Sequence, residues 1–118
     1  MSDLLELAQI TKTAFFYASA DVIDIKFTDG RTLEVYVAID ERARAHGLRG
    51  ISSLDLGGML FCYDTPVHTP FTMEGMSMDL DIAWFDEHGK LLGCETRSKD
   101  WPYPMIAPKN FSYVLECE

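Results

Sequence analysis

"VIDIKFTDGRTLEVYVAID", residues 22–40, is the stretch of sequence that decides the fold. Apolar residues occupy every second position of 23–27, and the same alternation resumes at 33–39 after the step "TDGR". Strict alternation is typical of a strand with one buried face, and Asp-Gly supplies the positive φ angles that a tight turn needs. The pattern predicts that segments 22–27 and 32–39 pair as an antiparallel hairpin across Asp29 and Gly30.

Two short helices are expected on either side of this hairpin. Residues 2–9 carry leucines along one side and Ser2 at the cap position. The segment "DERARAHG", residues 40–47, begins with Asp40, a favoured N-cap, and ends with Gly47, a favoured C-cap.

The rest of the chain consists of strand-like runs and one proline-rich segment. "SKDWPYPMIAP", residues 98–108, contains three prolines, which exclude a central strand and predict a surface loop. The runs that predict strands are 59–63, 80–85, 90–96 and 111–117, with the turn "DEHG" joining the second to the third. The expected fold is α+β and mainly β, a bent antiparallel sheet or partly closed small barrel with one or two short helices.

Composition limits what this domain can do. The chain has 118 residues and a formal net charge of −9, so we expect one domain over 1–118 and no direct nucleic-acid binding. No apolar run approaches the roughly 20 residues that cross a bilayer, and no secretory signal opens the chain. Its cysteines, Cys62, Cys94 and Cys117, lack zinc-type spacing and predict reduced thiols in a cytoplasmic protein.

Several motifs together resemble the domain of unknown function 192 family. They are "RAHGL", "GGMLFCYDTP", "PFTM", "LDIAWFDEHGKLLG" and "YPMIAPKNFSYVLE", in this order between about residues 35 and 116. The resemblance implies a compact, mainly β single domain without a settled activity, preceded here by the helix and hairpin of residues 1–34. The positions that match the family pattern are Arg44, Gly47, Leu48, Gly58, Met59, Leu60, Phe61, Phe71, Met73, Leu80, Asp81, Ile82, Gly89, Tyr103, Val114, Leu115 and Glu116.

This chain departs from the family pattern at its central motif. Thr72, Glu74, Gly75 and Asp79 stand where the family usually has tryptophan, lysine, asparagine and proline, and Arg49 replaces a methionine. The glutamate at position 74 inverts a charge in the middle of the motif.

Three methionines within residues 73–78 raise the question of a soft-metal site. Met73, Met76 and Met78, with Cys62 or His68, could supply thioether, thiol and imidazole ligands to Cu(I). The alternative is that Met73 packs inward while the other two fill gaps around a turn. The family pattern contains Met73 alone, which favours packing, and we expect no metal and no cofactor.

Asp79 and Asp81 lie two residues apart, so their side chains share one face of an extended segment. Such a pair could act as acid and base or hold a hard cation. Alternatively, Asp81 accepts hydrogen bonds from backbone amides or from Arg44 and fixes the turn into the strand.

The sequence favours a small cytoplasmic binding module, for a small ligand or a protein, over an enzyme, and it identifies no catalytic residue. The alternatives are a carboxylate- or metal-dependent hydrolase using Asp79 and Asp81, and an acidic protein that binds a basic partner surface. Loops on a rigid sheet commonly carry sites. The predicted binding site therefore joins Phe71, Met73, Asp81, Trp101 and Tyr103, with His68 at its rim and Arg44 beside Asp81.

Overall fold

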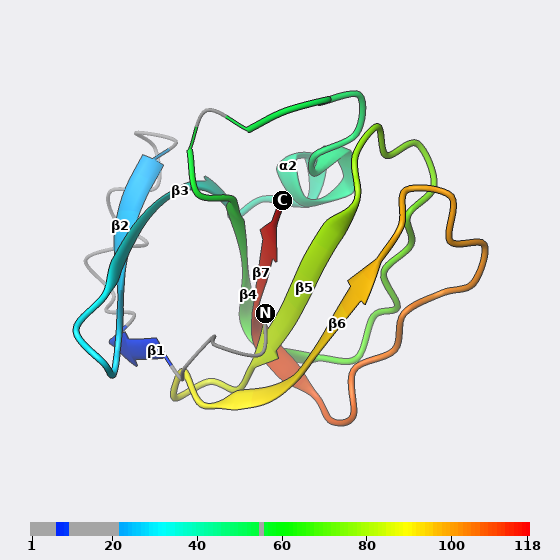
Figure 1. Ribbon diagram of the computed structural model, residues 1–118. Coiled ribbons are helices and arrows are strands. Elements are labelled where there is room, and N and C mark those ends of the chain that lie inside the picture. The colour runs from blue at the N-terminus through cyan, green and yellow to red at the C-terminus, as the bar shows by residue number, and fades with distance from the viewer. Residues whose placement is uncertain (1–6, 10–21, 55) are drawn as a thin grey trace.

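A single mixed sheet dominates the computed structural model, which describes residues 7–9, 22–54 and 56–118 (Figure 1). The sheet has seven strands in the order β1-β2-β3-β4-β7-β5-β6, so β1 and β6 are its edges and it does not close into a barrel. The strands are β1 (Leu7–Gln9), β2 (Val22–Phe27), β3 (Thr32–Ala38), β4 (Met59–Val67), β5 (Leu80–Phe85), β6 (Leu91–Arg97) and β7 (Phe111–Cys117). The α+β, mainly β class with a bent sheet is confirmed.

The predicted hairpin over residues 22–39 is present. β2 and β3 pair antiparallel with Val22 opposite Tyr36 and Ile25 opposite Leu33. Gly30 has a φ of 90°, and the side chain of Asp29 accepts a hydrogen bond of 2.9 Å from the Arg31 amide. The turn therefore depends on the two residues that predicted it.

One pair of strands departs from the expected antiparallel arrangement. β3 and β4 are parallel, with Val37 opposite Leu60. The reason is the long connection between them, which contains helix α2 (Glu41–His46). This connection returns the chain to the end of the sheet at which β3 begins, so β4 can run in the same direction as β3. The sheet is thus mixed.

Helix α2 is built as its sequence predicts. The Asp40 side chain accepts a 2.7 Å hydrogen bond from the Ala43 amide, and Gly47, at a φ of 54°, donates to the Ala43 carbonyl. The expected helix over residues 2–9 is wrong at Leu7–Gln9, which form β1 beside β2, because pairing with a sheet edge overrides a weak local preference. Its other residues lie outside those described.

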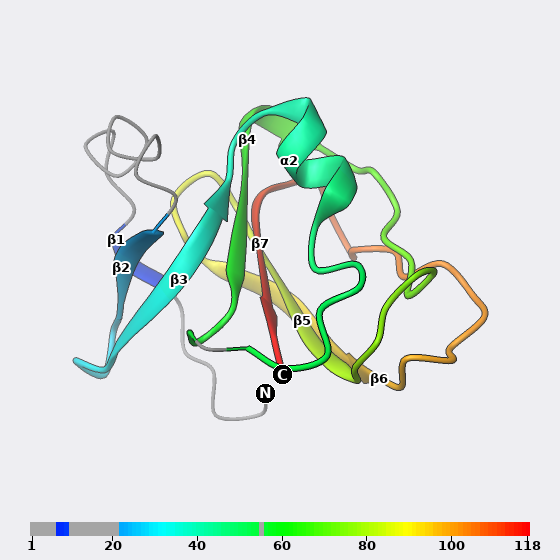
Figure 2. The same cartoon turned by 90° about the horizontal axis from the view of Figure 1, so that it is seen from above.

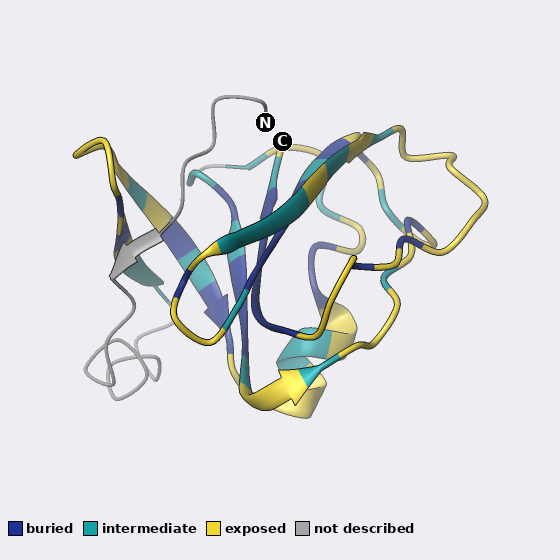
Figure 3. Cartoon of the chain, turned by 90° about the horizontal axis from the view of Figure 1, so that it is seen from below, coloured by how far each residue is buried: buried dark blue, intermediate teal, exposed yellow. Residues whose placement is uncertain are grey.

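Two hydrophobic clusters fill the opposite faces of the sheet, and the central strands are buried between them (Figure 3). Along β5, Ala83 and Phe85 belong to the first cluster while Ile82 and Trp84 belong to the second, as side chains on a strand alternate. We call the cluster that contains Ala83 and Phe85 the first core cluster, and the cluster that contains Ile82 and Trp84 the second core cluster. The first lies under the β2–β3 hairpin, and the second lies under α2 and the segments around 73–78 and 105–107.

The loop 98–108 contains no strand, as expected from its prolines. A single bridge joins Met105 to Phe71, with hydrogen bonds of 2.9 and 2.7 Å between their backbones. The loop therefore lies beside the segment that follows β4 (Figure 2 gives a second view).

All three cysteines are free thiols, as predicted. Cys62 is buried, and its burial raises the pKa of its thiol to about 12, whereas Cys94 is exposed on edge strand β6. No helix in the described part of the chain is long and apolar enough to span a bilayer.

Candidate functional site

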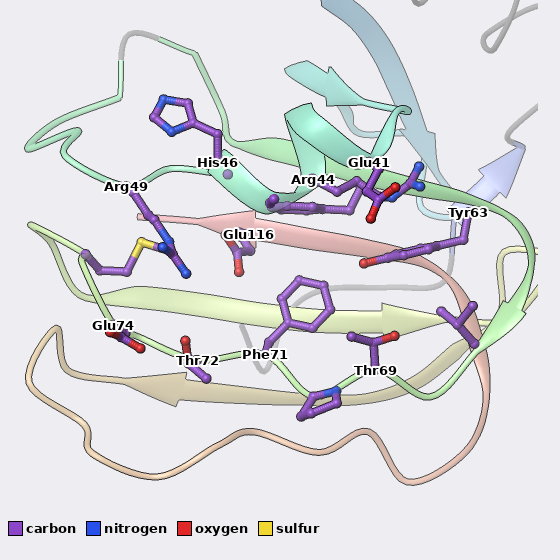
Figure 4. A pocket seen from close by; sticks show the side chains of 16 residues that line it. Glu41, Arg44, His46, Arg49, Tyr63, Thr69, Phe71, Thr72, Glu74 and Glu116 are labelled. Atoms are coloured by element: carbon purple, nitrogen blue, oxygen red, sulfur yellow. The ribbon is translucent and has the colours of Figure 1, made fainter.

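A cavity of about 660 Å³ opens on the face of the sheet that carries the second core cluster (Figure 4). Its walls are α2 with the turn that follows it, strand β4, and the segment 69–76, and the end of β7 reaches it through Glu116. Ligand sites usually have volumes of about 300–1,000 Å³, so this cavity has the size of a small-molecule site.

Glu116 is the residue that distinguishes the cavity. It is only 1% exposed, and its Oε1 atom is shielded from solvent without a hydrogen-bond partner among the described residues. Burial raises the pKa of Glu116 from 4.5 to about 7. A carboxyl group with such a raised pKa gains or loses its proton near neutral pH, which is uncommon for carboxyl groups and typical of functional sites.

The backbone around Glu116 depends on a close approach between two strands. Glu116 lies opposite Met59 in the β4–β7 pair and opposite Ile82 in the β5–β7 pair. A Cβ atom at Gly58 would lie 2.2 Å from the Glu116 carbonyl oxygen, so only glycine fits where the chain enters β4. The acid therefore lies on the central strand of a three-stranded part of the sheet, between β4 and β5.

Arg44 provides a fixed cation at the wall formed by α2. Its Nη1 donates to the carbonyls of Ile39 and of Cys62, the latter at 2.9 Å, and its Cζ lies 4.7 Å from the centre of the Tyr63 ring. No carboxylate forms an ion pair with Arg44 among the described residues. Burial raises the pKa of the Tyr63 phenol, while the charge of Arg44 acts in the opposite direction.

Arg49 lines the cavity from the turn after α2. The side chain passes close to Gly75, where an added Cβ would lie 3.4 Å from Arg49 Cδ, and the amide of Gly50 donates to the Gly75 carbonyl. These contacts bring the turn after α2 against the family's central motif. Within residues 22–54 and 56–118, Arg49 forms no ion pair.

Two of the seven predicted site residues, Arg44 and Phe71, line this cavity. Phe71 packs edge-on against Phe61, with ring centres 5.4 Å apart, and against Phe111 at 6.0 Å. Met73 is 1% exposed and packs in the second core cluster, as do the buried Met78 and the partly buried Met76.

The other four predicted residues lie elsewhere. Trp101 and Tyr103 pack edge-on at 5.6 Å in the loop 98–108, and Arg97 stacks on Trp101 at 4.6 Å. His68 Nε2 donates to the Ala107 carbonyl at 2.6 Å, which ties the two proline-bearing segments together. None of these side chains lines the cavity described above.

Asp81 and Asp79 have separate hydrogen-bonding partners. Asp81, with Ala83 and Phe85 on the face of β5 that carries the first core cluster, accepts a 2.6 Å hydrogen bond from the Thr96 hydroxyl on β6. Asp79 accepts a 2.8 Å hydrogen bond from the Lys99 amide at the start of the loop 98–108. No group of three His, Cys, Asp or Glu side chains suited to a metal ion occurs among the residues that the structure describes.

The predicted site lacks Tyr63, Arg49, Glu74 and Glu116, all of which line the cavity. Glu116 had two signals in its favour. It matches the family pattern, and it is the single acid within the strand "FSYVLEC", where a charged side chain must either be buried or reach a cavity. Arg49 and Glu74 were recognised only as departures from the family pattern. Tyr63 carried no signal in the sequence.

The fold and the cavity define a small β-rich domain with a ligand-sized hollow beside a buried acid. The chain belongs to the DUF192 family, described as "Uncharacterized ACR, COG1430", whose family model matches residues 23–118. The match includes the β2–β3 hairpin, most of which precedes the region around 35–116 that carried the resemblance. Among curated proteins, none matches this chain significantly.

Two solved structures are similar to this fold. A protein of unknown function from Novosphingobium aromaticivorans DSM 12444 has a TM-score of 0.69 and 24% identity, covering 82% of this chain and 71% of its own. A protein described as a "putative transcription regulator" from Sinorhizobium meliloti 1021 has a TM-score of 0.71 and 23% identity, covering 80% of this chain and 77% of its own. At this identity the likeness shows the fold alone.

Proposed function

We propose that this chain is a binding module for a small polar molecule, which enters the cavity between α2, β4 and the segment 69–76. The observation that carries the proposal is Glu116, a buried carboxyl group at the cavity whose Oε1 has no partner among the described residues. Arg44 and Phe71, two residues of the predicted site, line the same space.

The energetic argument concerns the cost of leaving such a group unpaired. A buried polar atom without a hydrogen bond costs about 1–3 kcal/mol, and native proteins keep few of them. Leucine or methionine at position 116 would fill the site without this cost. A ligand that donates a hydrogen bond to Glu116 gives the carboxyl group a partner. The free-energy cost of the unpaired group is then removed, and this gain adds to the binding free energy.

A thermal-shift experiment with a cavity-filling variant tests the proposal. Ala45 is exposed in the structure and lines the cavity, so Ala45→Trp places an indole in the ligand's space. Thr28→Trp, in the exposed turn between β2 and β3, is the matched control. A panel of polar metabolites should include a compound that raises the melting temperature of the wild type and the control but not of Ala45→Trp.

Two outcomes would refute the binding proposal. Equal responses of Ala45→Trp and Thr28→Trp would place the ligand outside this cavity. A panel without any response in the wild type would leave the unpaired carboxyl group without a ligand.

We also propose that the module works in the cytoplasm. The support is that Cys62, Cys94 and Cys117 are all free thiols, the usual state in reducing compartments. The net charge of −9 is compatible with a basic protein partner, which stays a prediction from composition.

A further inference from the structure

The charged groups of the cavity are separated rather than paired. Arg44 and Arg49 come from α2 and the turn after it, whereas Glu116 comes from β7. Figure 4 shows these side chains around one space, into which the Phe71 ring projects from the segment 69–76. No ion pair joins either arginine to Glu116 among the described residues.

The separation has an electrostatic consequence. Burial is the cause that raises the pKa of Glu116, as expected for a carboxyl group that no cation pairs with. Arg44 is held by two backbone carbonyls and by the Tyr63 ring, so it cannot swing across to the acid without losing those contacts. Among the described residues, Glu116 Oε1 therefore has no hydrogen-bond donor, and neither Arg44 nor Arg49 has a carboxylate partner, so a ligand can supply both.

We propose that the ligand is amphoteric, a free amino acid or a close analogue, whose ammonium group binds Glu116 and whose carboxylate binds Arg49 and Arg44. This inference rests on the proposed function and names its ligand class. A carboxylate pairs well with a guanidinium, often through two parallel hydrogen bonds. The rings of Tyr63 and Phe71 and the thioether of Met76 offer apolar contact to the ligand's side chain.

Binding of the ammonium group couples to the protonation of Glu116. The carboxyl group must lose its proton to form the ion pair, so the ligand displaces one proton wherever Glu116 is protonated in the empty domain. With a pKa of about 7 this amounts to about 0.9 proton at pH 6 and about 0.1 at pH 8. The other titratable or charged groups that line the cavity are Glu41, Arg44, His46, Arg49, Tyr63 and Glu74.

The experiment uses three forms of each of four amino acids as probes. Alanine, leucine, methionine and phenylalanine are titrated as the free amino acid, the N-acetyl derivative and the carboxamide, by calorimetry at pH 6 and pH 8. The wild type is compared with Glu116→Gln, Arg49→Gln and a control, Asp81→Asn, which alters a carboxylate outside the cavity. Each charge-assisted bond is expected to change affinity by about 10- to 100-fold.

The expected result is that at least one free amino acid binds the wild type and the control, with both derivatives at least about tenfold weaker. Glu116→Gln should weaken the free amino acid and the carboxamide but not the N-acetyl derivative, and it should abolish the proton release at pH 6. Arg49→Gln should weaken the free amino acid and the N-acetyl derivative. The carboxyl carbon of Glu116, followed by NMR, should titrate at a lower pH when the free amino acid is bound.

Equal binding of the three forms, or an affinity that Glu116→Gln leaves unchanged, would overturn the inference. If no free amino acid binds, but another metabolite still stabilises the wild type and not Ala45→Trp, the amphoteric ligand is wrong and the proposed function stands. If nothing binds in either experiment, both fail.

Discussion

The two faces of the sheet are closed by different kinds of structure. The first core cluster lies under the β2–β3 hairpin, where paired strands bring rows of apolar side chains together, including Ile25, Val35 and Phe85. The second face is covered by α2 and irregular segments, and there the sheet keeps its cavity. The two buried polar residues among those described, Ser112 and Glu116, occupy alternate positions of β7 that share this face with Val114.

The difference shows where this fold can accept a ligand. Strand-on-strand packing follows a regular repeat and leaves little free space, whereas turns set by glycines and prolines approach the sheet unevenly. An unpaired buried acid lowers the stability of the fold on either face, but the cavity on the second face gives a ligand access to it. Four measurements sharpen or break this comparison.

The largest effect is expected from truncation in the first core cluster. Phe85 is fully buried, so Phe85→Ala should lower the free energy of unfolding by about 3–5 kcal/mol. Phe71→Ala, at the cavity, should cost about 1–2 kcal/mol, because this partly buried ring already borders open space. Urea denaturation measures both, and equal costs would contradict the difference in packing between the faces.

The next effect is a pH dependence that Glu116 causes. Because the folded domain holds this proton more tightly than the unfolded chain, the free energy of unfolding falls as pH rises from 4.5 to about 7. The expected loss is about 3 kcal/mol, at about 1.4 kcal/mol for each pH unit.

Glu116→Gln serves as the reference for that measurement, since glutamine has a similar shape and does not titrate. The difference in unfolding free energy between wild type and variant, measured from pH 4 to pH 8, isolates the slope from all other groups. A flat difference would show that Glu116 is solvated or paired in solution.

A smaller effect is expected at Asp81, the carboxylate with a partner. Asp81→Asn weakens the charge-assisted bond from Thr96 and should cost about 1 kcal/mol, measured by urea denaturation at pH 7. Its ligand response in the thermal-shift panel should match that of the wild type. A stable variant with a lost response would move the site to the first face.

The smallest effect is expected in the loop 98–108. Trp101→Ala removes the stacking with Arg97, and since Trp101 is 37% exposed the cost should be about 0.5 kcal/mol. Ligand responses should be unchanged because Trp101 does not line the cavity. A lost response, seen by the same thermal-shift panel, would restore this aromatic pair to the binding site.

Sequence reasoning reached the local features of the second face and not its arrangement. Asp40, Gly47 and the boundaries of α2 follow from capping chemistry between residues close in the chain. The predicted site combined Phe71 and Arg44 with Asp81, yet Asp81 lies on the other face of β5 and bonds to Thr96. Closeness in sequence does not predict which side chains of a strand lie together, because successive residues of a strand point to opposite faces of the sheet.

By itself, the sequence determined strands β2 to β7, the hairpin at Asp29-Gly30, helix α2 and the family, since alternation, turn residues and caps act over a few residues. Only the tertiary structure decided that β3 and β4 run parallel and that β7 inserts between β4 and β5. That insertion carries Glu116 to the cavity that Tyr63 and Arg49 also line. A strand's place in a sheet depends on contacts among segments that are distant in the sequence. The burial that raises the pKa of Glu116 and the shape of the cavity depend on the same contacts.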